Sequence, residues 1–429
     1  MQRISARQSR TSTIEASDNM ISRRSLLALF PAALAWYAQA QVTSQSKLFA
    51  KKPKPGTTPV QPYVFFGTDT IKSSGKGIYV SRFDAKTGQL SQPTLAAATL
   101  RPAFMALSQM RVAGQDRRFL YVTNEGDEHT STISTFALDP AGILKQVGQV
   151  PAGFAGPCYV AVEGSGRAAF VASYTGSGVS TFRVQPDGTL SQPVDRVDFR
   201  NQKVFGHHGP NAERQEAPHP HSAMLSPDNR FLIVNDLGND TLVTFPLDAG
   251  TAHLDAPHVE TRPPGSGPRH LAFHPNGRWA YSINELSNRI DHFLWNTTHA
   301  TKLVEAEALL TDTGHSVSTL DASFHGVNTA AEVAVSPNGF FLYASNRGED
   351  SLVVFAIDQT SGELKLAQRF SCGGKGPRHF TFDPTGHWLV CGNQLSDSVT
   401  VFARDQANGQ LSGPVQTLAL QAPMFSLFA

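Results

Sequence analysis

The sequence predicts an all-β fold, a seven-bladed β-propeller whose ring is closed by the C-terminal strand. The first observation is a block that recurs along the chain, with clear copies at 267–296, 331–357 and 376–402. The second is that apolar and polar residues alternate within each copy, interrupted by Gly, Pro, Asn and Asp, as in antiparallel strands and their turns. The third is the length of the repeating unit, which suits a four-stranded blade.

The spacing of the copies sets the number of blades. Equivalent places are held by Pro227, Pro275, Pro337 and Pro384, which are 48, 62 and 47 residues apart. The longer interval indicates an insertion near 311–328, and weaker copies cover 119–138 and 168–184. Together with a first unit at 63–83, which lacks an opening strand, these copies make seven units.

The two ends of the repeat region complement each other. Residues 63–67 match the second strand of a blade, and the last segment, 423–428, resembles the opening strand at 102–107. We therefore expect the C-terminal strand to become the innermost strand of the first blade. Such closure pairs sheet edges that would otherwise stay open.

The first 40 residues have the features of an export signal. Arg23 and Arg24 precede an apolar run at 26–37, and residues 38–40, Ala-Gln-Ala, offer a small-residue cleavage site. Twin arginines before a modest apolar run favour the twin-arginine export route, and the run is too short to span a bilayer in the mature protein. The alternative is a basic N-terminal segment without a targeting role.

These features predict three parts of the chain. Residues 1–40 are the export signal, residues 41–61 a flexible polar linker, and residues 62–429 one propeller domain. We expect a periplasmic or secreted protein, or a cytoplasmic one if the leader has another role.

Composition limits the partners. The chain has 36 Lys plus Arg and 35 Asp plus Glu, and removal of 1–40 leaves 31 and 33. A net charge of −2 does not provide the basic face that nucleic acids require. The three cysteines show no disulfide framework or metal spacing, although one bond between Cys372 and Cys391 stays open. We expect no cofactor, no metal, no stable membrane insertion after signal cleavage, and a monomer.

Polar residues recur at two places in the repeat. Because successive strands are antiparallel, the loop entering the first strand and the loop between the second and third strands lie at the same end of the ring, which we call the mouth. The first set of loops carries 218–221, 268–270, 331–333 and 377–379, and the second carries 235–236, 284–285, 346–347 and 393–394. Two groups of polar side chains are therefore expected to meet. These side chains could instead have purely structural roles, as hydrogen bonds to a neighbouring blade or, for the asparagines, as caps of turns.

The segment 209–222, Gly-Pro-Asn-Ala-Glu-Arg-Gln-Glu-Ala-Pro-His-Pro-His-Ser, resembles the signature of the seven-bladed lactonase family. That family includes bacterial propeller-type 6-phosphogluconolactonases and fungal carboxy-cis,cis-muconate cyclases. The similarity extends through 267–270, 284–287, 331–333, 345–348 and 392–394. It implies catalytic roles for Glu285, Arg269, Arg347 and either His219 or His221. Position at the mouth adds Glu332 and Arg378 as substrate-binding residues, with Arg214, Asp236 and Gln394.

The resemblance implies a lactone hydrolase that acts on a sugar lactone or another anionic lactone. Hydrolysis needs a base for water and a donor for the oxyanion, and arginine forks suit an anionic substrate. No Ser-centred nucleophile motif occurs, so direct attack by water is expected, with Glu285 as base. Replacing Glu285 by Gln should then lower turnover by about 10²-fold with little change in melting temperature.

Two alternatives stay open. One is a cycloisomerase that closes an unsaturated dicarboxylate with the same Arg and Glu residues. The other is a non-enzymatic exported propeller of the surface-repeat type, because residues 121–124, Tyr-Val-Thr-Asn, are the tetrapeptide that names those repeats.

Overall fold

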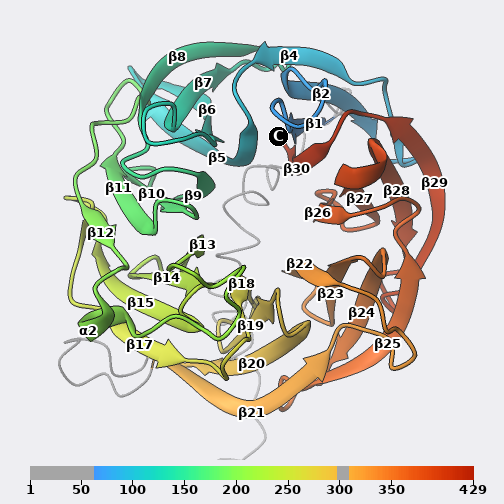
Figure 1. Ribbon diagram of the computed structural model, residues 1–429. Coiled ribbons are helices and arrows are strands. Elements are labelled where there is room, and N and C mark those ends of the chain that lie inside the picture. Colours follow the sequence, from blue (N-terminus) through green and yellow to red (C-terminus); the bar gives the residue numbers. More distant parts are fainter. Residues whose placement is uncertain (1–61, 297–308) are drawn as a thin grey trace, which may run out of the picture. The chain divides into compact units, whose positions relative to one another are not determined.

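The computed structural model describes residues 62–296 and 309–429, which form a ring of seven antiparallel sheets (Figure 1). The predicted seven-bladed propeller is therefore confirmed. The expected export signal at 1–40 and linker at 41–61 lie outside the described residues. Within the described part of the chain, no helix is long and apolar enough to cross a membrane.

Blades 1 to 3 come from both ends of the described chain. Blade 1 consists of β30 (Pro423–Phe428), β1 (Tyr63–Thr68), β2 (Gly77–Asp84), β3 (Gln89–Leu90) and β4 (Thr94–Ala98). Blade 2 consists of β5 (Pro102–Val112), β6 (Gln115–Asn124), β7 (Thr132–Leu138) and β8 (Leu144–Pro151). Blade 3 consists of β9 (Pro157–Val162), β10 (Ala168–Ser173), β11 (Gly178–Arg183) and β12 (Arg196–Asp198).

Blades 4 to 7 follow in chain order. Blade 4 has β13 (Pro220–Leu225), β14 (Phe231–Asp236), β15 (Thr241–Asp248), β16 (His253–Leu254) and β17 (His258–Thr261). Blade 5 has β18 (Pro268–Phe273), β19 (Trp279–Asn284), β20 (Arg289–Trp295) and β21 (Leu310–Ser318). Blade 6 has β22 (Thr329–Val335), β23 (Phe341–Arg347), β24 (Ser351–Ile357) and β25 (Leu364–Ser371). Blade 7 has β26 (Pro377–Phe382), β27 (Trp388–Asn393), β28 (Ser398–Arg404) and β29 (Leu411–Ala419).

Two short helical turns, α2 (Gln202–Phe205) and η2 (Gln394–Ser396), lie in loops. The Pro-Asn-Gly and Pro-Thr-Gly segments turn between first and second strands, where Gly277 and Gly386 have φ of 69° and 72°. Glycine adopts this left-handed backbone without a steric penalty. The predicted insertion near 311–328 agrees with the structure only in part. Residues 311–318 belong to the outer strand β21, and 319–328 form the loop into blade 6.

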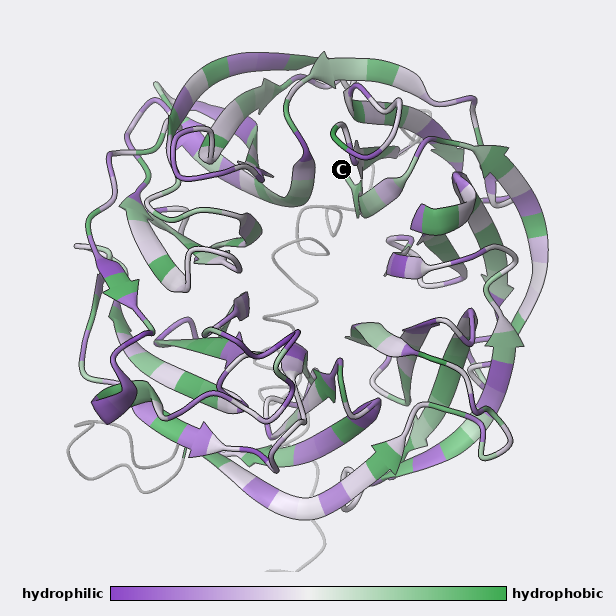
Figure 2. Ribbon diagram, in the orientation of Figure 1, coloured by the Kyte–Doolittle hydropathy of each residue, from purple (hydrophilic) through white to green (hydrophobic). Residues whose placement is uncertain are grey.

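The hydrophobic core lies between the blades. Among the described residues, seven apolar clusters each join two neighbouring blades, so every sheet is covered on both faces. The second strand β14, Phe-Leu-Ile-Val-Asn-Asp, is accordingly buried at every position. Figure 2 shows this as mostly green inner sheets with purple segments along the outermost strands. Strict alternation therefore survives best in the outer strands, where one edge meets water.

The C-terminal strand closes the ring as predicted. β30 pairs antiparallel with β1, with Phe428 opposite Val64 and Phe425 opposite Gly67. Backbone hydrogen bonds between Tyr63 and Ala429, of 3.1 and 2.9 Å, extend the ladder. Blade 1 is thus assembled from residues more than three hundred positions apart in sequence.

Candidate active site

A β-bulge near the start of the innermost strands positions the side chains of the mouth. In β18 the pairing with β19 skips Arg269, which lies opposite no partner residue. His221 in β13 and Arg378 in β26 are skipped in the same way. Each follows a proline, which has no N–H for the ladder, and a bulge redirects the extra side chain. The same local feature in three blades thus presents an imidazole and two guanidinium groups at the mouth.

Glu285 lies between three arginines at the mouth. Its Oε1 is 2.5 Å from Nη2 of Arg214, which precedes β13. Its Oε2 is 2.8 Å from Nη2 of Arg347 and 3.1 Å from Nε of Arg269. Glu285 follows β19 and Arg347 ends β23, so both come from loops between second and third strands. The two groups of loops therefore meet, as expected, at Arg269, Glu285 and Arg347, and Arg214 joins them from the segment before β13.

The charges around Glu285 decide its chemistry. Burial raises the pKa of Glu285, but the three guanidinium groups outweigh burial and hold that pKa far below its usual range. A carboxylate kept so firmly charged is a weak proton acceptor. Burial and the nearby Arg347 lower the pKa of Arg269 to about 9, so this guanidinium keeps its charge at neutral pH. Glu285 therefore suits the role of holding the arginines better than the role of base that the sequence suggested.

The two histidines of the signature have different surroundings. Nδ1 of His219 is 2.9 Å from the carbonyl of Tyr174, and Nε2 is 3.1 Å from Oε1 of Glu216. Its ring also stacks on Tyr174 with centroids 4.1 Å apart. In contrast, neither ring nitrogen of His221 has a hydrogen-bond partner among the described residues, and its Nδ1 is buried. Burial first, and then Arg269 and neighbouring cations, hold the pKa of His221 well below its usual value. His221 is thus a neutral imidazole at pH 7 that is free to accept a proton.

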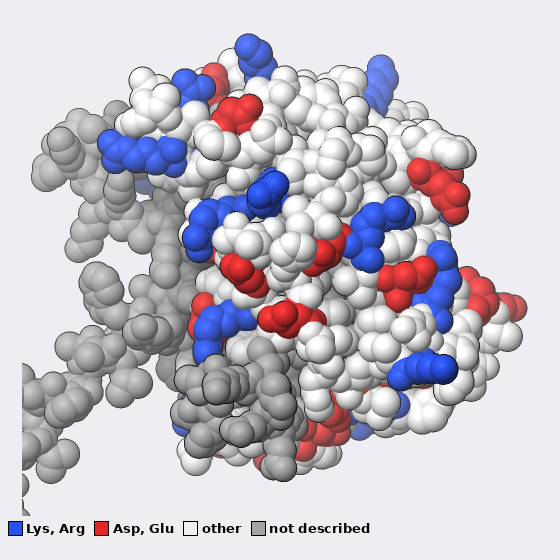
Figure 3. All heavy atoms as spheres, turned by 90° about the vertical axis from the view of Figure 1, so that its left-hand side faces the viewer, with Lys and Arg blue, Asp and Glu red and all other residues white. Residues whose placement is uncertain are grey.

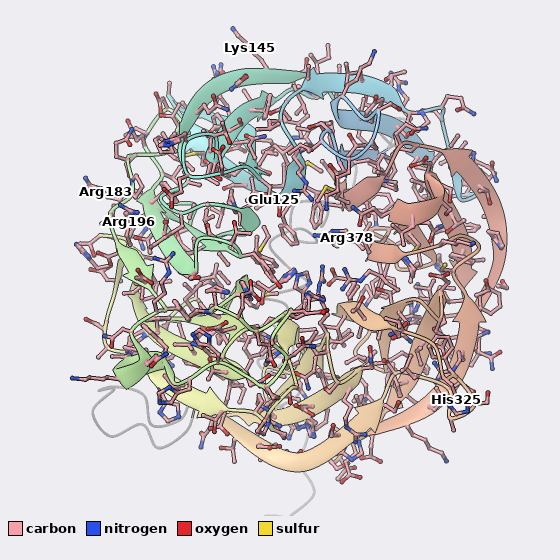
Figure 4. All side chains as sticks on the ribbon, viewed as in Figure 1. Glu125, Lys145, Arg183, Arg196, His325 and Arg378 are labelled. Carbon is pink, nitrogen blue, oxygen red and sulfur yellow. The ribbon has the colours of Figure 1, made fainter. Side chains whose placement is uncertain are left out.

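Arg378 brings a further positive charge to the mouth. Its guanidinium makes no ion pair or hydrogen bond among the described residues, and the residue is only partly buried. Arg101 differs, because it pairs with Glu125 at 3.2 Å and with Asp69 at 3.4 Å. Figure 4 shows Arg378 and Glu125 at the inner side of the ring. On the side of the molecule in Figure 3, by contrast, Lys/Arg and Asp/Glu residues are interspersed.

Below the mouth, side chains that follow the bulges form a layer of rings across the centre, which we call the ring layer. Its members are Phe104, Tyr159, His270, His379 and Phe425. The Phe104 centroid is 4.1 Å from that of Tyr159 and 4.0 Å from that of Phe425. The apolar rings pack tightly, and the two histidines place polar nitrogens in the same layer.

Glu332 lies between the two histidines of the ring layer. Its Oε2 is 3.1 Å from Nδ1 of His270 and 3.5 Å from Nε2 of His379. Glu332 and His379 also line a cavity of about 690 Å³ that reaches the turns after β9 and β13, and we call this cavity the lower chamber. The structure therefore separates Glu332 from the Glu285 cluster and places it at the boundary between mouth and chamber.

Two predicted binding residues lie elsewhere. Oδ1 of buried Asp236 accepts the backbone N–H groups of His219 at 2.6 Å and Gly238 at 3.0 Å. Burial raises the pKa of Asp236 to about 7. This carboxyl group holds the loop behind His219 rather than facing a ligand. Gln394 begins η2 and makes no side-chain hydrogen bond to the Glu285 cluster among the described residues.

The asparagines that end the second strands serve the fold. Each donates a side-chain hydrogen bond to a neighbouring group inside the protein, namely Asn235, Asn284, Asn346 and Asn393. These asparagines thus have structural partners, as the alternative expected, but the partners lie on neighbouring strands and loops rather than in the turn that each asparagine was expected to cap.

Sequence reasoning missed several residues of the site. The Tyr174 hydroxyl accepts a hydrogen bond of 3.3 Å from Arg214, and nothing in that weaker copy of the repeat indicated this contact. His270 and His379 were visible only as the last residue of two Pro-Arg-His segments. The recurrence of His after Arg in two blades was the signal that pointed to them.

Within residues 62–296 and 309–429, no three His, Cys, Asp or Glu side chains are grouped to hold a metal ion. The cysteines are buried free thiols, so the bond between Cys372 and Cys391 that the sequence left open is not formed. Burial raises the pKa of the Cys158 thiol to about 12. These thiols stay protonated and pack as small apolar groups.

The fold and the mouth define a seven-bladed propeller with a site rich in arginine. The chain belongs to the family "Lactonase, 7-bladed beta-propeller", whose model matches residues 63–428. The resemblance seen in the sequence is therefore confirmed.

Named relatives support the same assignment. The chain is 32% identical to a 6-phosphogluconolactonase of Bacillus subtilis over 74% of this chain and 84% of that protein. It is 31% identical to a 6-phosphogluconolactonase of Formosa agariphila over 75% of this chain and 86% of that protein. The structure of a periplasmic gluconolactonase of Pseudomonas aeruginosa superposes with a TM-score of 0.73 at 32% identity, covering 86% of this chain and 98% of that chain.

Proposed function

We propose that this protein hydrolyses an anionic sugar lactone at the mouth, as a 6-phosphogluconolactonase-like carboxylic ester hydrolase. Two observations carry the proposal. Among the described residues, the guanidinium of Arg378 near the Glu285 cluster has no ion pair, and the imidazole of His221 has no hydrogen-bond partner. Three guanidinium groups around one locked carboxylate, with Arg378 as a fourth nearby, favour an anion, and a neutral imidazole among them suits proton transfer. The named lactonases among the relatives favour this function over the cycloisomerase and the surface-repeat alternatives.

In this mechanism His221 accepts a proton from water as the water oxygen attacks the lactone carbonyl. Negative charge then develops on the carbonyl oxygen, where the guanidinium groups of Arg269 and Arg347 stabilise it without reorienting, because Glu285 holds them in place. The ring C–O bond breaks, and the proton on His221 passes to the departing alkoxide. Arg378 binds the anionic group of the substrate.

The first prediction concerns His221. Replacement of His221 by Asn should lower kcat by about 10²-fold or more, because a positioned base contributes that much. Since its pKa is held low, wild-type activity should persist to below pH 6.5 and fall only as more acidic pH protonates the imidazole. Replacement of the exposed His208 by Asn is the matched control and should change neither kcat nor the pH profile. An unchanged kcat in H221N would assign the base elsewhere.

The second prediction concerns substrate charge. Replacement of Arg378 by Ala should raise KM for a phosphorylated lactone by about 10- to 100-fold, because a hydrogen bond to a charged group contributes about 1.5–3 kcal/mol. KM for an uncharged lactone should change little. The melting temperature should stay unchanged, since Arg378 makes no ion pair or hydrogen bond within the described residues that the substitution would remove. The control is Arg183→Ala on the outer side of the ring, as Figure 4 shows. Equal losses for both substrates would contradict the role of Arg378 in binding the anion.

We further propose export by the twin-arginine route to the periplasm or beyond, with a monomeric mature protein and no stable membrane insertion. The support is the Arg23-Arg24 segment before its apolar run, together with a relative described as periplasmic. Replacement of both arginines by Lys should leave the precursor in the cytoplasmic fraction. Undiminished export of that variant would argue for the general secretory route.

A further inference from the structure

Hydrolysis of a lactone at neutral pH produces a proton that has to leave the site. Water and the ester give a carboxylate, an alcohol and one H⁺. The leaving alkoxide takes the first proton, and the second comes from the carboxylic acid product. At the mouth this second proton meets His221 and the guanidinium groups around Glu285, which disfavour a lasting positive charge on the imidazole. A nearby carboxylate that can accept this proton would remove that charge.

A chain of titratable groups leads from the mouth to the lower chamber. The rings of His221 and His270 lie edge to face, with their centroids 5.1 Å apart and an interplanar angle of 65°, a gap that a ring rotation or one water can bridge. Nδ1 of His270 is 3.2 and 3.1 Å from the two carboxylate oxygens of Glu332. Glu332 in turn lines the lower chamber.

We propose that His270 and Glu332 carry this proton from His221 to the lower chamber, a route that rests on the proposed lactonase activity. His221 passes the proton to His270, whose other nitrogen gives its proton to Glu332, and Glu332 releases it to the chamber. No bond other than N–H and O–H is made or broken, and no oxidant is needed. Glu332 thus acts through His270 and is a positioning and proton-accepting residue.

The charges that face the two groups favour transfer between them. Nη1 of Arg269 is 3.4 and 3.3 Å from the two ring nitrogens of His270, so this cation lies over the ring. Burial, Arg269 and Arg378 lower the pKa of His270 well below its usual value. Burial raises the pKa of Glu332, against the opposing effects of His379, Arg269 and Arg378. The proton affinities of imidazole and carboxyl group therefore approach each other, and the proton is not trapped on either.

Chemical rescue tests this route. Replacement of Glu332 by Ala opens a space beside the lower chamber that a small carboxylate can fill. We expect kcat for lactone hydrolysis to fall by at least about 10-fold. Added formate should then restore part of the loss, while chloride at equal ionic strength should not. Replacement of Glu332 by Gln, which keeps the shape, should show the same loss without rescue, and its pH–rate profile should differ from that of the wild type.

The matched control is Thr381→Val, which changes another residue of the chamber wall that does not contact His270. Wild type and this control should hydrolyse the lactone at similar rates. Given that result, two outcomes would show that the route is wrong. In the first, both Glu332 variants keep the wild-type kcat and pH profile. In the second, they lose activity, formate restores none of it, and they melt at a lower temperature. If wild type and control show no hydrolysis, the proposed function fails and the route fails with it.

Discussion

Removal of residues 423–429 should abolish the folded state. β30 is buried along its whole length. Phe425, Leu427 and Phe428 pack in the interfaces of blade 1 with its two neighbours, and the side chain of Met424 is buried as well. Full burial of such side chains contributes about 1.5–3 kcal/mol each, so the four together contribute roughly 6–12 kcal/mol. That sum is comparable with the whole stability of a typical protein, about 5–15 kcal/mol. Loss of the strand also exposes the edge of β1 to aggregation.

Circular dichroism and size-exclusion chromatography of the truncated protein check this result. Replacement of Met424 by Leu, which conserves volume at the bulge position, should leave the melting temperature nearly unchanged. A peptide of residues 423–429 added in trans should recover part of the folded signal. A truncated protein that melts cooperatively at the wild-type temperature would show that β30 does not hold the ring closed.

Replacement of Glu285 by Gln should strongly destabilise the protein as well as inactivate it. The change leaves three guanidinium groups facing one another, of which Arg269 is almost fully buried. Removal of one partner from a buried ion pair costs about 3–5 kcal/mol, because an uncompensated charge stays behind. The sequence alone led to the opposite expectation for the melting temperature, since it offered no view of the three partners.

Two measurements separate this explanation from general damage. Inorganic phosphate should raise the melting temperature of the Glu285→Gln protein more than that of the wild type, because an anion replaces the lost charge. The stability that Glu285 contributes is fully present above its unfolded pKa of about 4.3 and is lost as pH falls toward its lower folded pKa. The difference between the two proteins should therefore shrink below about pH 4. The exposed Glu213→Gln is the control, and a Glu285→Gln protein as stable as this control would contradict the three-arginine cluster.

The repeat made the fold predictable, whereas the separate roles of the side chains at the mouth could be assigned only from the three-dimensional structure. Alternation, turn residues and unit length led to seven blades, and antiparallel order alone placed Arg269 near Glu285. The local sequence does not predict the bulge that redirects His221, Arg269 and Arg378, because a proline at the start of a strand is common and does not by itself indicate a bulge. Nor does sequence show that His219 is held on both nitrogens while His221 is not. Part of that difference arises from Tyr174, which is 45 residues from His219 in sequence and meets it only in the folded ring.

The position of Glu332 shows the same limit. Its loop lies at the mouth, as antiparallel topology requires, but the bulge of β22 spans both Ala331 and Glu332. That extra residue turns the carboxylate into the ring layer, toward His270 and His379. A residue that sequence assigned to substrate binding is thereby placed beside the lower chamber.

The most direct test of the arginine-rich mouth as a lactone-hydrolysing site is acid release followed in a pH-stat with purified mature protein and 6-phosphogluconolactone. We predict release well above the spontaneous rate, a kcat/KM at least about 10-fold greater than for glucono-lactone, and loss of that preference in the Arg378→Ala protein. Folded protein that releases no acid above background from 6-phosphogluconolactone, glucono-lactone or an aryl lactone would contradict the account.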